Sequence, residues 1–173
     1  AHLPASTPVF PQRILVHAPE FFSKKLLDLG ADDRSHRRDS LRLLQETVDK
    51  AAELARHFTG QPSVVVHLGG MSMDDAPRDR RQVLDRIVEG LLRLDVHGVS
   101  VLPENLPPRP WYLGGQWYQS VLTRPEDFLY IHEHTGLGMT FDISHAQLEC
   151  NHSGLRLIDL IRECRPIIKH LHV

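Results

Sequence analysis

Histidines and carboxylates follow directly after short apolar runs at five places in the chain. His17, His67 and Glu104 follow the first three runs, Asp142 follows the fourth, and His170 and His172 belong to the fifth. Short apolar runs bounded by turn residues are typical of buried parallel strands. We therefore expect five strands to deliver these side chains to one place, as the strands of an α/β barrel do at its C-terminal mouth.

The residue types indicate which ion such a site would hold. Imidazole and carboxylate ligands suit a divalent cation such as Zn²⁺, Mn²⁺ or Fe²⁺, whereas Mg²⁺ and Ca²⁺ prefer oxygen ligands alone. Asp142 and His145 are spaced so that a strand end and the following turn bring both into one mouth. For each of these residues a structural role, such as capping, stays the alternative. Of His170 and His172, we expect one to face the interior and the other to face the helices.

Strand and helix patterns alternate along the chain. Strands are expected at 14–16, 64–66, 99–102, 137–141 and 167–173, and helices at 39–58, 79–94, 125 to about 134, and 153–164. The apolar residues of the first helix recur with the 3.6-residue period, and Ser153 is a suitable cap for the last. Parallel strands joined by crossover helices follow from this order. Neighbouring strands should then contain Val65, Val101, Phe141 and Ile168.

The predicted fold class is α/β, with parallel strands in a TIM-barrel-like (β/α) arrangement. A complete barrel of this kind needs eight strands and about 250 residues. The 173 residues provide about five of the eight β/α units. We treat residues 1–173 as a single partial-barrel domain, in which 1–12 is a lead-in loop and 20–38 is a partly helical connection.

The segment 103–124 is the most unusual part of the sequence. It contains both tryptophans, Trp111 and Trp117, and begins with Glu104 and Asn105 at a strand end. A long aromatic loop beside a strand-end carboxylate suits a substrate lid or wall. We therefore predict substrate contacts for Asn105, Trp111 and Trp117. The alternative is that the aromatic residues cover a core edge or a subunit interface. In the second case the protein would be a homo-oligomer.

Composition narrows the class of protein. The net charge is −2 with the histidines neutral, so no global basic field favours nucleic acid or a membrane. We find no signal peptide and no apolar run long enough to span a bilayer, and Cys150 and Cys164 suit free thiols in a reducing compartment. A cytoplasmic protein is expected. The basic run 34–38 is interpreted as a solvated helix start, with phosphate binding as the alternative.

Five motifs in order carry a family resemblance. They are V-H-A-P at 16–19, V-V-H-L-G-G at 65–70, P-E-N at 103–105, F-D-I-S-H at 141–145 and K-H-L-H-V at 169–173. Together they resemble the xylose isomerase-like barrel superfamily. This group includes sugar and sugar-phosphate isomerases and epimerases, and abasic-site nucleases of the endonuclease IV type.

The resemblance implies different ligand sets for its two branches. By resemblance to the nucleases, His17, His67 and Glu104 would hold one metal ion. Glu104 would bridge to a second ion held also by Asp142 and His172, and His145 would belong to a third. By resemblance to the isomerases, Glu104, Asp142 and His172 would hold a single ion, and Glu104 would double as a catalytic base. In both branches a last glutamate ligand would come from beyond Val173.

Three functions follow from these observations. The first is a metal-dependent isomerase or epimerase of carbohydrate metabolism, in which a carboxylate moves a proton on a sugar or sugar phosphate. The second is metal-dependent phosphodiester hydrolysis at abasic DNA, which the pair His17 and His67 favours and the absence of a basic surface disfavours. The third is a barrel segment that binds a metal ion or a sugar without catalysis.

Overall fold

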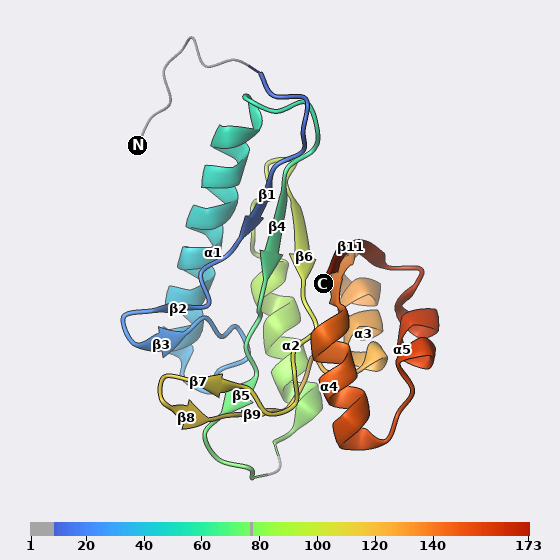
Figure 1. Cartoon of the computed structure of the whole chain (residues 1–173). Coiled ribbons are helices and arrows are strands. Elements are labelled where there is room, and N and C mark those ends of the chain that lie inside the picture. Colours follow the sequence, from blue (N-terminus) through green and yellow to red (C-terminus); the bar gives the residue numbers. More distant parts are fainter. Residues whose placement is uncertain (1–8, 77) are drawn as a thin grey trace.

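The computed structural model describes residues 9–76 and 78–173, so most of the predicted lead-in loop lies outside the described residues. Its main strands are β1 (Leu15–His17), β4 (Ser63–Val66), β6 (Ser100–Pro103), β10 (Met139–Asp142) and β11 (Ile168–His172). Its helices are α1 (Arg34–Ala55), α2 (Arg80–Leu91), α3 (Pro125–Thr135), α4 (Ile143–Ser153) and α5 (Leu157–Cys164). Figure 1 shows the strands at the centre of the molecule, with helices around them.

The main strands are all parallel and follow one another in chain order. One group pairs in the order β1-β4-β6, a second pairs β10 with β11, and a bridge between Glu104 and Thr140 joins the two groups. The predicted neighbours Val65, Val101, Phe141 and Ile168 therefore lie in adjacent strands. Within the described residues no strand pairs with the outer edge of β1 or β11. The predicted α/β fold is confirmed as an open, partial barrel.

The core lies between the sheet and the helices that cover its outer face. Fully buried apolar side chains from strands and helices form it, among them Val64, Val66, Leu44, Val48, Ala51, Ile87 and Ile131. Full burial of such a side chain contributes roughly 1.5–3 kcal/mol. The cysteines, Cys150 and Cys164, are buried free thiols. Of the helices in the described ranges, none has both the length and the apolar character needed to cross a bilayer.

The first helix begins earlier than the sequence pattern predicted. α1 starts at Arg34 rather than at position 39, because the side chain of Asp33 accepts hydrogen bonds from the backbone N–H groups of Ser35 and His36. This N-cap satisfies donors that have no partner within the helix. The helix also ends at Ala55, three residues before the predicted end.

The prediction of one helix over 153–164 is wrong. α4 begins at Ile143, directly after Asp142, whose carboxylate accepts the backbone N–H of His145 at 2.7 Å. Gly154 ends this helix with a left-handed φ of 75°, and α5 follows separately. Ser153 is therefore the last residue of α4 and does not cap a helix. The α4 segment was missed because its apolar positions form only a weak helical pattern.

Three short antiparallel pairs occupy the connections that follow the main strands. They are β2 (Phe21–Phe22) with β3 (Lys25–Leu26), β5 (Met71–Ser72) with β9 (Tyr118–Gln119), and β7 (Trp111–Tyr112) with β8 (Gly115–Gln116). Two-residue strands have no detectable period, so the sequence did not predict them. The buried carboxylate of Asp28 joins two of these connections, accepting the backbone N–H groups of Gly30 and Gly70 at 2.8 and 2.9 Å.

Candidate metal centre

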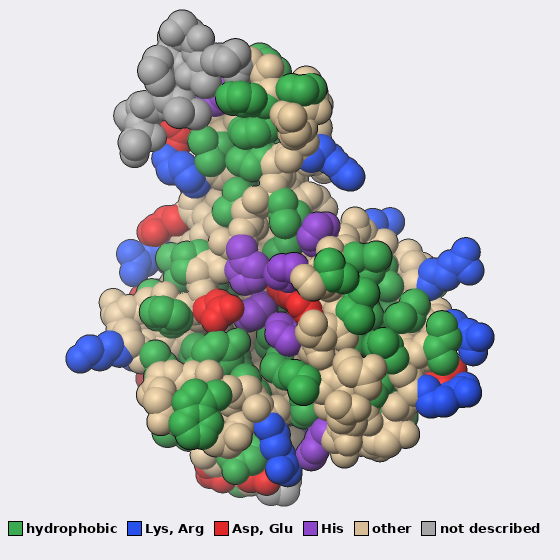
Figure 2. Space-filling model, viewed as in Figure 1, with side chains coloured by type: hydrophobic (Ala, Val, Ile, Leu, Met, Phe, Trp, Pro, Cys, Tyr) green, Lys and Arg blue, Asp and Glu red, His purple; other side chains and the backbone are tan. Residues whose placement is uncertain are grey.

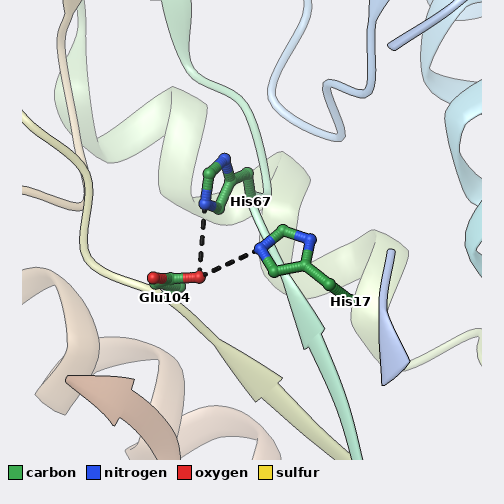
Figure 3. Close-up of side chains that lie close together, drawn as sticks. All are labelled: His17, His67 and Glu104. Atoms are coloured by element: carbon green, nitrogen blue, oxygen red, sulfur yellow. Dashed lines mark hydrogen bonds and ion pairs between the residues drawn. The ribbon is translucent and has the colours of Figure 1, made fainter. Parts of the chain in front are cut away.

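Glu104 lies at the centre of a group of imidazole side chains. It follows β6, and its side chain is fully buried. Its Oε2 atom lies 3.3 Å from Nε2 of His17 and 3.2 Å from Nε2 of His67, and its Oε1 atom lies 2.8 Å from Nδ1 of His172. Figure 3 shows His17 and His67 pointing at the carboxylate from neighbouring strands. Three strands thus aim a ring at one buried acid.

The imidazoles keep Glu104 ionised. Burial alone would raise the pKa of this carboxyl, but hydrogen bonds with His17, His67 and His172 more than offset burial and hold the pKa well below its ordinary value. Glu104 therefore carries a negative charge throughout the physiological pH range. A buried anion surrounded by imidazoles is a suitable ligand for a divalent cation.

Ligand atoms gather in two groups that share Glu104. His17, His67 and Glu104 form one group, and Glu104, Asp142 and His145 form the other, with the ligand atoms of each group within 4.8 Å of one another. His172 adjoins the second group, since its Nδ1 atom lies 3.6 Å from Oδ2 of Asp142. The structure thus brings together all the predicted ligand residues. Figure 2 shows the histidines gathered around acidic side chains near the middle of one face.

The ring orientations test whether these residues fit a metal ion. Nδ1 of His17 donates to the carbonyl of Ala18, and Nδ1 of His145 donates to the carbonyl of Asn105, each at 2.8 Å. Because a carbonyl oxygen only accepts, these bonds place the proton of the neutral ring on Nδ1 and leave the lone pair on Nε2. In the metal-free protein, Nε2 of His17 can donate to Glu104 only when the ring is protonated, so a cation would take the place of that proton. Metal-binding histidines are usually oriented in this way. The residues therefore fit a divalent cation, although their role as ligands stays a prediction.

Asn105 ties the ends of β6 and β10 together. Its side-chain Nδ2 donates to the carbonyl of Asp142 at 2.9 Å, and its Oδ1 accepts the backbone N–H of Asp142 at 2.7 Å. The backbone carbonyl of Asn105 accepts the hydrogen bond from His145. The buried Asn105 therefore contacts the predicted ligand Asp142 through its side chain and the predicted ligand His145 through its backbone. Substrate contact by Asn105 stays a prediction.

The hairpin formed by β7 and β8 places a tyrosine, Tyr112, rather than a tryptophan, near Glu20 and Glu104. Trp111 is 69% exposed, and the ring N–H of Trp117 donates to the carbonyl of Tyr112 at 2.9 Å. Burial, together with the charges of Glu20 and Glu104, raises the pKa of Tyr112 to about 12. Glu20 also lies 3.6 Å from Nδ1 of His67.

Sequence reasoning missed both Tyr112 and Glu20. The available signal for Glu20 was its position three residues after the strand-end His17. Substrate contacts of Trp111 and Trp117 stay predictions.

The expected opposite orientation of His170 and His172 is wrong. Residues two apart in a strand point to the same face, and these two rings lie with their centroids 6.3 Å apart. In register, His170 is opposite Thr140 and His172 is opposite Asp142. Only His172 reaches Glu104, because it is one layer nearer the end of the strand.

Protonation of His17 should oppose metal binding. Its hydrogen bond with Glu104 raises the pKa of His17 above its ordinary value of 6.5, against the opposite effect of burial. Because a protonated His17 holds Glu104 by a charged hydrogen bond and repels a cation beside it, we expect metal affinity to rise as the pH rises through the raised pKa of His17 and then to level off. The raised pKa stabilises the metal-free fold below about pH 6.5, and this stabilisation is lost as the pH rises through the raised value.

Metal titrations and melting of the metal-free protein across this pH range measure both trends. His17→Gln should flatten the dependence on pH in each measurement. Metal affinity that falls as the pH rises would contradict the assignment of His17.

Comparison with known proteins agrees with this fold. A family described as "Xylose isomerase-like TIM barrel" matches residues 11–173. A D-tagatose 3-epimerase-like protein is similar in structure, with a TM-score of 0.66, 24% identity, and 93% of this chain and 55% of that chain covered. Endonuclease IV from Thermus thermophilus is also similar, with a TM-score of 0.59, 23% identity, and 91% of this chain and 51% of that chain covered.

A D-psicose 3-epimerase has a TM-score of 0.63 at 17% identity, with 92% of this chain and 51% of that chain covered. The chain thus spans about half the length of these structures, and at these identities the similarity shows the fold. No curated protein matches the sequence. The family match covers nearly the whole sequence, and with the parallel strands and outer helices it shows that this chain belongs to the xylose isomerase-like TIM barrel family.

Proposed function

We propose that this chain carries the metal-binding part of a metal-dependent isomerase or epimerase of sugars or sugar phosphates. The observation that carries the proposal is the position of Glu104, a buried and ionised carboxylate at a strand end beside Asp142 and His172. Support comes from two similar structures described as a D-tagatose 3-epimerase-like protein and a D-psicose 3-epimerase in the presence of D-fructose.

In this proposal each group of residues has a separate task. Glu104, Asp142 and His172 hold a divalent cation, Zn²⁺, Mn²⁺ or Fe²⁺, which would polarise the carbonyl and hydroxyl oxygens of a bound sugar. Trp111 and Trp117 contribute an apolar wall to the substrate site, and Asn105 contributes a polar contact at its floor. The half-buried Tyr112 lies next to Trp111 in β7, near enough to Glu20 and Glu104 for their charges to raise its pKa.

Glu104 is proposed to serve mainly as a metal ligand, and only in addition as a proton acceptor. Its low pKa suits a ligand, because the anionic form persists at every working pH. The same low pKa makes it a weak base near neutrality, where an efficient base has a pKa close to the working pH. Proton transfer by Glu104 therefore requires that its hydrogen bonds with the imidazoles break when the substrate binds, so that its pKa rises.

A second candidate is hydrolysis of phosphodiester bonds at abasic sites in DNA. His17 and His67 favour it, since together with Glu104 they complete a second group of ligand atoms that a single-metal isomerase does not need. The charge distribution disfavours it. Figure 2 shows most Lys and Arg side chains of this face toward its edges rather than among the central histidines, whereas DNA binding relies on cationic contacts to phosphates.

The two reactions can be separated on the same metal-loaded sample. For the isomerase or epimerase, we expect a ketohexose or its phosphate to exchange a carbon-bound hydrogen beside the carbonyl in heavy water, with a chelator abolishing the exchange. His17→Gln should preserve most of this exchange, because His17 lies outside the proposed single-metal set. Cleavage of an abasic oligonucleotide that is lost in His17→Gln would instead support the nuclease, and tight metal binding without either reaction would support the non-catalytic alternative.

A further inference from the structure

A hollow whose lining includes five arginines lies between α1 and α2, and we call it the arginine groove. Its volume is about 590 Å³. The charged residues that line it are Arg34, Arg37, Arg38, Arg86, Arg93 and Glu89. Five arginines therefore line one hollow, with a single acidic residue among them. None of these residues belongs to the metal centre, and the chain as a whole is slightly acidic.

Nearby acids neutralise this charge only in part. Arg86 forms a close ion pair with Asp32. Arg38 is 4.0 Å from Asp39 and Arg93 is 3.9 Å from Glu89, at the outer limit for an ion pair, and both arginines are largely exposed. Exposed pairs of this kind contribute about 0–1 kcal/mol.

The two remaining arginines have no acidic partner among the described residues. Arg37 donates from Nη1 to the carbonyls of Ala31 and Asp32 at 2.6 and 2.9 Å. These carbonyls fix the position of the guanidinium without cancelling its charge. No ion pair involves Arg34 in the described part of the chain. The groove therefore keeps an excess of positive charge.

Helix stability does not explain why three of these arginines occupy the beginning of α1. The N-terminus of a helix is the positive end of its dipole, so cations there are unfavourable. The first turn of α1 contains no acidic residue, and the capping carboxylate of Asp33 already satisfies the backbone donors of Ser35 and His36. The arginines are thus placed at an electrostatic cost that a bound anion would offset.

We propose that the arginine groove binds a small anion that carries phosphate. Guanidinium groups present paired N–H donors that match phosphate oxygens, and arginine is preferred over lysine where such geometry matters. The volume of the groove is in the range of small-molecule sites, which favours a compact ligand with one or two phosphates. A nucleic acid backbone would instead require a cationic stripe along a face. The proposal is independent of the function assigned to the metal centre.

Calorimetric titration of the full chain with inorganic pyrophosphate tests the proposal, with inorganic phosphate as a second probe and sodium chloride of equal ionic strength as the blank. A chelator is present throughout, so that the probe cannot bind through a cation at the metal centre. We expect the double variant Arg34→Gln and Arg93→Gln to weaken pyrophosphate binding by about tenfold or more. Both side chains are exposed, so the variant should keep the melting temperature of the parent.

The matched control is the double variant Arg42→Gln and Arg162→Gln. It removes the same charge from exposed positions outside the groove, on α1 and α5, and should change the affinity less than about twofold. Equal loss in both double variants would overturn the proposal, because it would indicate attraction by diffuse charge. Absence of pyrophosphate binding would overturn it as well. Binding of an oligonucleotide without binding of pyrophosphate would show a surface for polyanions and overturn the small-ligand assignment.

Discussion

Replacement of Glu104 by glutamine is expected to weaken binding of a divalent cation by about a thousandfold. The change keeps the shape of the side chain but removes the charge that both groups of ligand atoms share. A unit charge about 4 Å from another contributes about 4 kcal/mol at an effective dielectric of about 20, which corresponds to about three orders of magnitude in Kd. Metal titration of Glu104→Gln against the parent measures this loss, and turnover should be abolished with it.

The same replacement should lower the stability of the metal-free protein moderately. The imidazole partners more than offset the solvation that the carboxylate loses on burial, so the ionised group stabilises the metal-free fold at neutral pH. The amide oxygen of glutamine can still accept from one of the imidazoles, which limits the loss. We expect the free energy of unfolding without metal to fall by about 1–2 kcal/mol.

Glu149→Gln is the matched control for this experiment. Glu149 is likewise a buried carboxylate, but it lies on α4 beside Arg124, with Oε1 at 3.3 Å from Nε. Its replacement should lower the melting temperature and leave metal affinity unchanged. If Glu104→Gln behaved like Glu149→Gln, with a lower melting temperature and normal metal binding, the assignment of Glu104 as a ligand would be wrong.

Replacement of Asn105 by alanine is expected to lower both stability and metal affinity. The change leaves the buried backbone N–H and C=O of Asp142 without their partners, at a cost of about 2–4 kcal/mol for the two together. Glu104 precedes Asn105 directly and Asp142 is its partner, so their relative position would no longer be fixed. Loss of such a supporting contact usually weakens metal binding by about 10–100-fold.

Two further variants show whether Asn105 acts through position. Asn105→Asp keeps the acceptor for the N–H of Asp142 but loses the donor to its carbonyl, and should fall between alanine and the parent in both measurements. Asn151→Ala, on the exposed surface of α4, should change stability by less than about 0.5 kcal/mol and leave metal binding intact. Unchanged metal affinity in a folded Asn105→Ala protein would restrict Asn105 to a structural role.

The sequence by itself determined the parallel strands, the outer helices and the residues that meet at one end of the sheet. This was possible because burial of a parallel strand demands a continuous apolar run, and each run ends where polar groups can again reach solvent or one another. His17, His67, Glu104 and Asp142 could be assigned to one mouth from their place after such runs. The direction of a strand and the place of a residue within or just after an apolar run are local properties of the chain. A local sequence pattern is therefore enough to predict them.

Only the tertiary structure decided which of these side chains touch. That Glu104 faces rings from β1, β4 and β11 depends on strand order and register, which are relations between distant segments. The pairing of Asn105 with the backbone of Asp142 likewise depends on the single bridge that joins β6 to β10. The start of α4 at Ile143 and the two-residue strands left no periodic signal, because their stability comes from caps and contacts with neighbouring loops rather than from a repeating apolar face.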